Sequence, residues 1–109
     1  MTAARHNRRM TALDPAATID SLACNPRLAP FVRDRRVGTM PAKLSRRRLL
    51  LDAVAQGFEP GVRYPEPAVN EFLRHIHADH AALRRYLVDE DFLDRADGFY
   101  WRIGGSTSG

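Results

Sequence analysis

Apolar residues recur at helical spacing through the middle of the chain and predict three helices. They cover residues 46–56, 67–76 and 80–90. Ser45 is the expected N-cap of the first helix, and Gly57 stands just past its end. The inward positions of the three helices are Leu50, Ala53, Val54, Val69, Phe72, Leu73, Ile76, Leu83, Tyr86 and Leu87. We expect one core built from these stripes.

The segment before these helices is less regular. Asp14 followed by Pro15 is a strong helix start, so we expect a helix over residues 16–23. A second short helix is expected over residues 27–33, followed by a turn or short strand over residues 34–39.

The pattern changes to alternation after residue 90. Two short strands flank Asp97 and Gly98, a pair typical of a tight hairpin turn. Tyr100 is expected on one face of the hairpin, with Phe99 and Trp101 on the other. We expect Trp101 to be buried against the last helix.

This order of elements predicts a mainly α fold with a C-terminal β-hairpin: a winged helix-turn-helix preceded by two short helices. Phe58 and Tyr64, in the loop before the helix over residues 67–76, are expected to fill the core of the domain. The predicted organisation is a flexible basic arm (1–13), an N-terminal helical extension (14–40), a winged-helix-like domain (41–103) and a flexible tail (104–109).

Composition narrows the class of protein. The chain has 109 residues, 17 Lys and Arg against 13 Asp and Glu, and a net charge of +4. A single cysteine allows no internal disulfide, and no apolar run is long enough to span a membrane, so we expect a cytoplasmic protein. No nucleophile stands near a base and no glycine-rich phosphate loop occurs, so we expect no enzyme activity and no cofactor.

Arginines are concentrated at two places that suit an anionic partner. Arg46–Arg48 fill the first turn of a helix, where cations oppose the helix dipole unless an anion binds. Arg84 and Arg85 follow the small residue Ala81, as in a helix that enters the major groove. The expected nucleic-acid-binding residues are Lys43, Arg46, Arg47, Arg48, Arg84, Arg85, Arg95 and Arg102. Against this interpretation, five acidic residues follow closely: Asp89, Glu90, Asp91, Asp94 and Asp97.

Three histidines and an aspartate lie within residues 75–80. His77, Asp79 and His80 are candidate metal ligands, but His75 and His77 point in different directions from a helix end, and zinc needs three or four converging ligands. The favoured alternative is structural, with Asp79 as a helix N-cap and His77 packed in the turn. We therefore expect no metal.

Residues 34–103 resemble the bacterial domain-of-unknown-function family numbered 2087. The resemblance is carried by Pro41-Ala42-Lys43, the arginines before Leu49, Tyr64, Glu66, Val69-Asn70, His77, Asp79, Leu83-Arg84-Arg85, Leu87-Val88, Arg95, Gly98, Tyr100 and Trp101. It implies a protein found alone or joined to ArsR-type helix-turn-helix regulators. Pro65 departs from the family, which usually has a small hydroxyl residue there, so we expect the charge of Glu66 to favour the helix start instead.

These observations favour a DNA-binding transcriptional regulator whose partner is double-stranded DNA. A homodimer formed through the N-terminal helices would supply two half-sites. Two alternatives remain open from the sequence: a protein-interaction module of the same fold that does not bind DNA, and a small-ligand or metal sensor that uses the His77 region.

Overall fold

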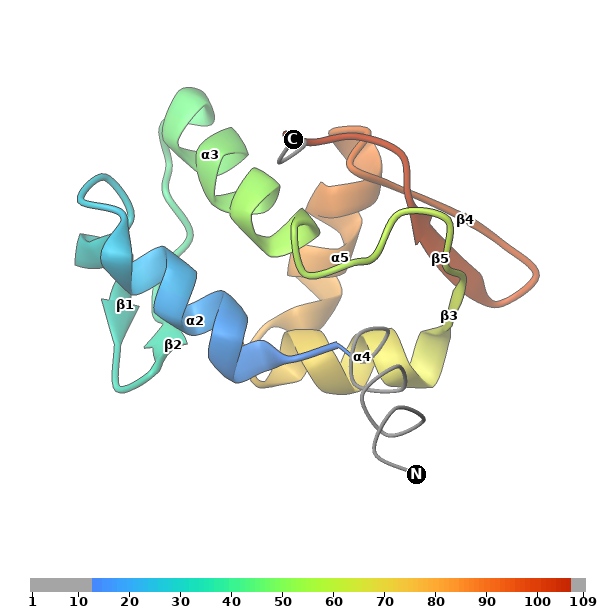
Figure 1. The fold of residues 1–109 in the computed structure, drawn as a ribbon. Helices are drawn as coiled ribbons and strands as arrows, with labels where there is room; N and C mark the ends of the chain where they lie inside the picture. Colours follow the sequence, from blue (N-terminus) through green and yellow to red (C-terminus); the bar gives the residue numbers. More distant parts are fainter. Residues whose placement is uncertain (1–12, 107–109) are drawn as a thin grey trace.

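The computed structural model describes residues 13–106, and these form helices and two small antiparallel sheets (Figure 1). The four α-helices of this part of the chain are α2 (Pro15–Cys24), α3 (Leu44–Ala55), α4 (Glu66–Arg74) and α5 (His80–Asp89). A 3-10 turn, η1, covers Ala29–Phe31. The strands are β1 (Val32–Arg33), β2 (Arg36–Val37), β3 (Tyr64–Pro65), β4 (Leu93–Ala96) and β5 (Phe99–Arg102).

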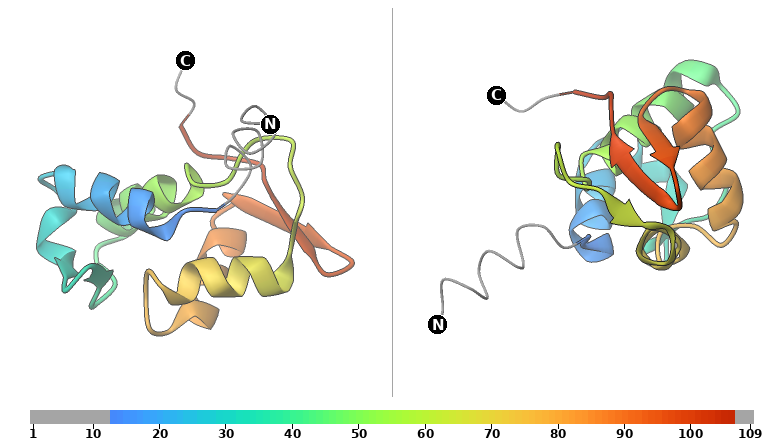
Figure 2. Two further views of the ribbon diagram at one scale, coloured as in Figure 1. Left: turned by 60° about the horizontal axis from the view of Figure 1, so that its bottom comes forward. Right: turned by 90° about the vertical axis from the view of Figure 1, so that its right-hand side faces the viewer.

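The larger sheet lies at one end of the molecule and has the order β3-β5-β4 (Figure 1). Its central strand pairs Tyr100 with Tyr64 on one side and with Arg95 on the other. The helices lie behind the sheet in the right-hand view of Figure 2, so one face of the sheet is directed into the core. From α3 onwards the chain runs helix, strand, helix, turn, helix and hairpin.

The apolar stripe predicted for α4 is confirmed. Val69, Phe72, Leu73 and Ile76 are all buried, and the ring of Phe72 meets Phe58 edge to face at 5.4 Å. Phe58 also contacts the ring of Tyr64 at 5.3 Å, as the expected core-filling loop requires. Edge-to-face aromatic pairs add to the free energy of burial.

The first turn of α4 is completed by the hairpin. Pro65 occupies the N-cap position and makes no side-chain cap bond. The backbone N–H of Glu66 instead donates to the carbonyl of Gly98 at 2.9 Å. This bond satisfies one of the N–H groups that a helix start leaves without a partner.

The turn between α4 and α5 is tied to the N-terminal segment. Asp79 caps α5, since its carboxylate accepts from the N–H of Ala82 at 3.1 Å, as predicted. His77 is buried in the turn, and its Nδ1 is 2.9 Å from the carbonyl oxygen of Val37. The N–H of Val37 donates to the carbonyl of Ile76 at 2.7 Å. Three residues of the turn are thus fixed by hydrogen bonds.

The prediction of a second short helix over residues 27–33 is wrong. Only the 3-10 turn η1 forms, and Val32 then pairs with Val37 in a two-stranded sheet. Pro30 lacks the N–H that a helix would need there. Asp34 and Arg35 have φ values of 55° and 63°, which close a tight hairpin turn.

Helix α3 begins one residue before the predicted cap. Lys43 is at the N-cap position without a side-chain bond, so Ser45 is not the cap. The buried residues of α3 are Leu50, Leu51, Val54 and Ala55, while Ala53 is half-buried.

The hairpin turn is confirmed, but the burial predicted for Trp101 is wrong. Asp97 and Gly98 have φ values of 54° and 80°, as a two-residue hairpin turn demands. Tyr100 is the residue directed into the core, with 1% of its surface exposed. Trp101, its neighbour, faces away and stacks under the guanidinium of Arg63 at 4.2 Å.

The C-terminal residues up to Ser106 return to α3. The N–H and hydroxyl of Ser106 donate to Asp52 at 2.8 and 2.7 Å. Burial opposes the ionised form of Asp52, but the hydrogen bonds from Ser106 and Gln56 outweigh it, so its pKa lies below the ordinary value.

Residues 1–12 of the predicted basic arm and residues 107–109 of the predicted tail lie outside the described residues. Within the described part, no helix is both long enough and apolar enough to cross a bilayer.

Replacing the α5 cap should destabilise the fold. We expect Asp79→Ala to lower the free energy of unfolding by about 1 kcal/mol, because the N–H of Ala82 loses its acceptor. Asp89→Ala, in the last turn of the same helix, is the control, and it should not destabilise the fold, because a carboxylate at a helix C-terminus is unfavourable with the helix dipole. Urea unfolding followed by circular dichroism measures both; equal effects would contradict the capping role.

Candidate nucleic-acid interface

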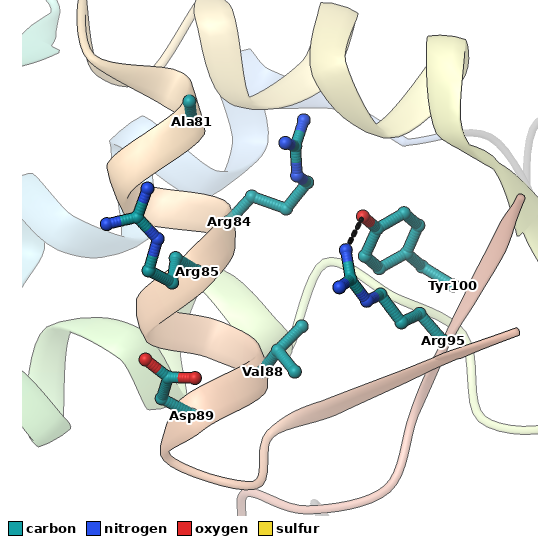
Figure 3. Close-up of a pocket in the computed structure, with 7 residues that line it drawn as sticks. All are labelled: Ala81, Arg84, Arg85, Val88, Asp89, Arg95 and Tyr100. Carbon is teal, nitrogen blue, oxygen red and sulfur yellow. Dashed lines mark hydrogen bonds between the residues drawn. The ribbon is translucent and has the colours of Figure 1, made fainter.

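A cleft of about 250 Å³ lies between the outer side of α5 and the β4–β5 hairpin (Figure 3). Its lining carries three arginines and one carboxylate. The lining residues are Ala81, Arg84, Arg85, Val88, Asp89, Arg95 and Tyr100. We call this cleft the arginine cleft.

Helical periodicity brings the α5 residues of the cleft together. At about 100° per residue, Ala81, Arg84, Arg85, Val88 and Asp89 fall on one arc of the helix. The opposite side carries the buried residues of α5, Leu83 and Leu87. Arg85 is exposed on this arc, and Arg84 and Val88 are partly buried where it turns toward the hairpin.

Hydrogen bonds from neighbouring elements hold two of the cleft arginines in position. Arg84 donates to the side-chain oxygen of Asn70 on α4. Arg95 donates to the hydroxyl of Tyr100 at 3.4 Å, and this hydroxyl donates to Glu66 at 3.3 Å. The bond to Tyr100 raises the pKa of Arg95. Holding a guanidinium in place reduces the side-chain entropy lost when it binds an anion.

The acidic residues at the end of α5 and after it do not all lie at the arginine cleft. Asp89 alone among the five lines the arginine cleft. Glu90 forms an ion pair with Arg48 of α3. Asp94 pairs with Trp101 across the sheet, on the face away from the core, and Asp97 lies in the hairpin turn. These acidic residues are close together in the sequence, but they are not gathered at the arginine cleft.

The three consecutive arginines of α3 make contacts within the fold. Arg46 donates to the carbonyl of Arg27 at 3.2 Å. Arg47 donates to the carbonyls of Pro41 and Ala42 and stacks on Tyr86 at 5.0 Å. Arg48 pairs with Glu90 and lies over the ring of Phe92 at 5.2 Å.

Tyr86 and Glu90 are on the flank of α5 turned away from Arg84 and Val88, so α3 and the arginine cleft lie on different sides of α5.

The two remaining predicted residues are also outside the cleft. Arg102 donates to the carbonyls of Phe58, Gly104 and Ser106 and thus ties the end of β5 to the tail. Lys43 is exposed at the start of α3. Of the eight residues predicted to bind nucleic acid, Arg84, Arg85 and Arg95 come together.

The candidate metal ligands do not converge. His77 is buried with its Nδ1 at the carbonyl of Val37, and Asp79 caps α5. His75 is exposed and contacts the carbonyl of Glu71. Within residues 13–106, no three His, Cys, Asp or Glu side chains gather as a metal ion would need. The bond and burial of His77 agree with the structural interpretation of this segment.

The sequence did not predict that Asn70, Glu66 and Tyr100 position the cleft arginines. All three are among the residues that carry the family resemblance. The polar residue Asn70, on the same helix as the buried stripe, could have indicated a contact of this kind. Its partner Arg84 could not be identified, because it lies 14 positions away on another helix.

A family model described as "Uncharacterized protein conserved in bacteria (DUF2087)" matches residues 36–102 of this chain. Comparison with curated proteins and with solved structures gave no match.

Truncation of the α3 arginines should reveal their structural role. We expect Arg47→Ala and Arg48→Ala each to lower the free energy of unfolding by about 1 kcal/mol, because each loses hydrogen bonds and a cation–π contact. Arg85→Ala is the matched control, and its effect should stay within about 0.5 kcal/mol, since Arg85 is exposed. Chemical denaturation measures all three, and a neutral Arg47→Ala would show that this side chain does not support the fold.

Proposed function

We propose that this chain, which belongs to the bacterial family DUF2087, is a winged helix-turn-helix protein that binds double-stranded DNA and regulates transcription. It acts by binding and catalyses no reaction. In this proposal α4 and α5 are the helix-turn-helix, α5 is the recognition helix, and the β4–β5 hairpin is the wing.

The order of elements supports the fold part of the proposal. A helix, a short strand, two helices joined by a tight turn and a hairpin follow one another from α3 to β5. The short strand β3 pairs with the second hairpin strand, which gives the order β3-β5-β4. In a helix-turn-helix the second helix lies in the major groove, and residues toward its N-terminal end contact the bases.

The arginine cleft is the observation that carries the function. It has three guanidiniums, one carboxylate and walls made by α5 and the hairpin. Guanidinium groups bind phosphate oxygens with two parallel hydrogen bonds, and most protein–DNA bonds go to the backbone. Arg84 and Arg95 are assigned to phosphates because both are held by polar neighbours.

Arg85 is assigned to the base edges. It is exposed on the outer arc of α5, and Ala81, one turn earlier, is small and exposed, so the helix can approach the groove closely. Asp89 is in the last turn of α5, one turn beyond Arg85 and farther from the N-terminal end of the helix, which contacts bases in this class of protein.

DNA binding that depends on salt and on the cleft arginines tests the proposal. With a labelled generic duplex, fluorescence anisotropy should give a Kd of about 1–100 µM near physiological salt and tighter binding at lower salt. Arg85→Ala should weaken binding to a selected preferred sequence about tenfold. Arg95→Ala should weaken binding to all sequences and reduce the salt slope by about one.

Arg33→Ala is the matched control, because Arg33 is exposed on β1, at the end of the molecule opposite the large sheet (Figure 1). It removes the same charge and should leave the affinity within about twofold. Absence of binding at low salt would refute the proposed function. Equal losses in Arg33→Ala and Arg85→Ala would place the DNA surface elsewhere.

A further inference from the structure

The face of the β3-β5-β4 sheet that points away from the core carries an exposed apolar strip. Phe99 and Ile103 expose 40% and 51% of their surfaces, and Trp101 between them is half-buried. The outer sheet face, as we call it, consists of Arg63, Pro65, Asp94, Ala96, Phe99, Trp101 and Ile103. Within the described part of the chain no helix lies over it (Figure 2, right).

One row across this face has a cation, an aromatic ring and an anion in register. Asp94 on β4 is the direct partner of Trp101 on β5. Tyr64 pairs with Tyr100, so Arg63 stands opposite Trp101 on the other side. The guanidinium of Arg63 lies 4.2 Å from the centre of the Trp101 ring. The row is therefore positive at the β3 edge and negative at the β4 edge.

We propose that the outer sheet face binds a second copy of this chain, with a two-fold axis parallel to β5. A rotation about that axis places β3 of one copy over β4 of the other. Arg63 of each copy then faces Asp94 of the other, and the Trp101 rings meet at the centre. The same contact is made twice, as a closed two-fold dimer requires.

The charge row selects this axis over the other one available. A two-fold axis across the strands would place Arg63 over Arg63 and Asp94 over Asp94, and opposed like charges destabilise an interface. With the axis along β5, the strands of the two sheets stay nearly aligned, which is a common way for sheets to pack face to face.

The sequence suggested the N-terminal helices as the dimer contact, but no large apolar side chain of α2 is exposed. Ile19 and Leu22 of α2 are buried within their own chain. The outer sheet face is small, so we expect a reversible dimer and not an obligate one. This dimerisation does not depend on DNA binding and is tested without DNA.

Sedimentation equilibrium of the full chain tests the interface. From about 10 µM to about 1 mM, the average mass should rise from one chain toward two. Arg63→Asp and Asp94→Arg should each raise the dimer Kd at least about tenfold, because each substitution creates two like-charge contacts by symmetry. The double variant Arg63→Asp/Asp94→Arg should return toward the native Kd, since it exchanges the two signs.

Phe99→Glu should also abolish the dimer, and Arg33→Asp, with the same change in charge on β1, should leave it intact. Circular dichroism and the urea midpoint check that every variant is folded. A chain that stays monomeric throughout this range overturns the proposal. A dimer that persists unchanged in Arg63→Asp and Phe99→Glu overturns it as well, because association would then use another surface.

Discussion

The bonds between Val37 and the turn that follows α4 are the constraint on which the domain depends. The N–H of Val37 donates to Ile76, and its carbonyl lies 2.9 Å from the ring of His77. Since Asp79 begins α5 immediately afterwards, the direction in which α5 leaves the turn is set there. The arginine cleft combines residues of α5 with residues of the hairpin, so its shape depends on that direction.

These hydrogen bonds join residues that the sequence pattern assigned to two different segments. Sequence pattern put the start of the domain at residue 41, after the last irregular segment. Val37 lies before that point, and the family match begins at residue 36, which includes it. Strand β2 is therefore tied by hydrogen bonds to the turn between α4 and α5. The sequence pattern did not indicate this, because a strand of two residues has almost no periodicity.

Most local signals were read correctly from the sequence, although the Ser45 cap and the helix over residues 27–33 were not. Contact partners far along the chain were not predicted. The α4 stripe, the Asp79 cap and the Asp97–Gly98 turn are properties of a few adjacent residues, so pattern and propensity reveal them. The arginines of α3 look available in sequence because Tyr86 and Glu90, which they contact, lie about 40 positions away. For the same reason the sequence could not show that Arg84, Arg85 and Arg95 are the three arginines that share a cleft.

Alternation along β5 identified two sets of residues without saying which set faces inward. The two-residue turn at Asp97–Gly98 makes that choice, because it fixes which residues of β4 and β5 stand opposite each other. A slip of one position would turn every side chain of the strand over. Tyr100 would leave Glu66 and Arg95, and Trp101 would enter the core. The arginine cleft and the outer sheet face thus depend on the same register between β4 and β5. An insertion in this turn that shifts the register would disrupt both.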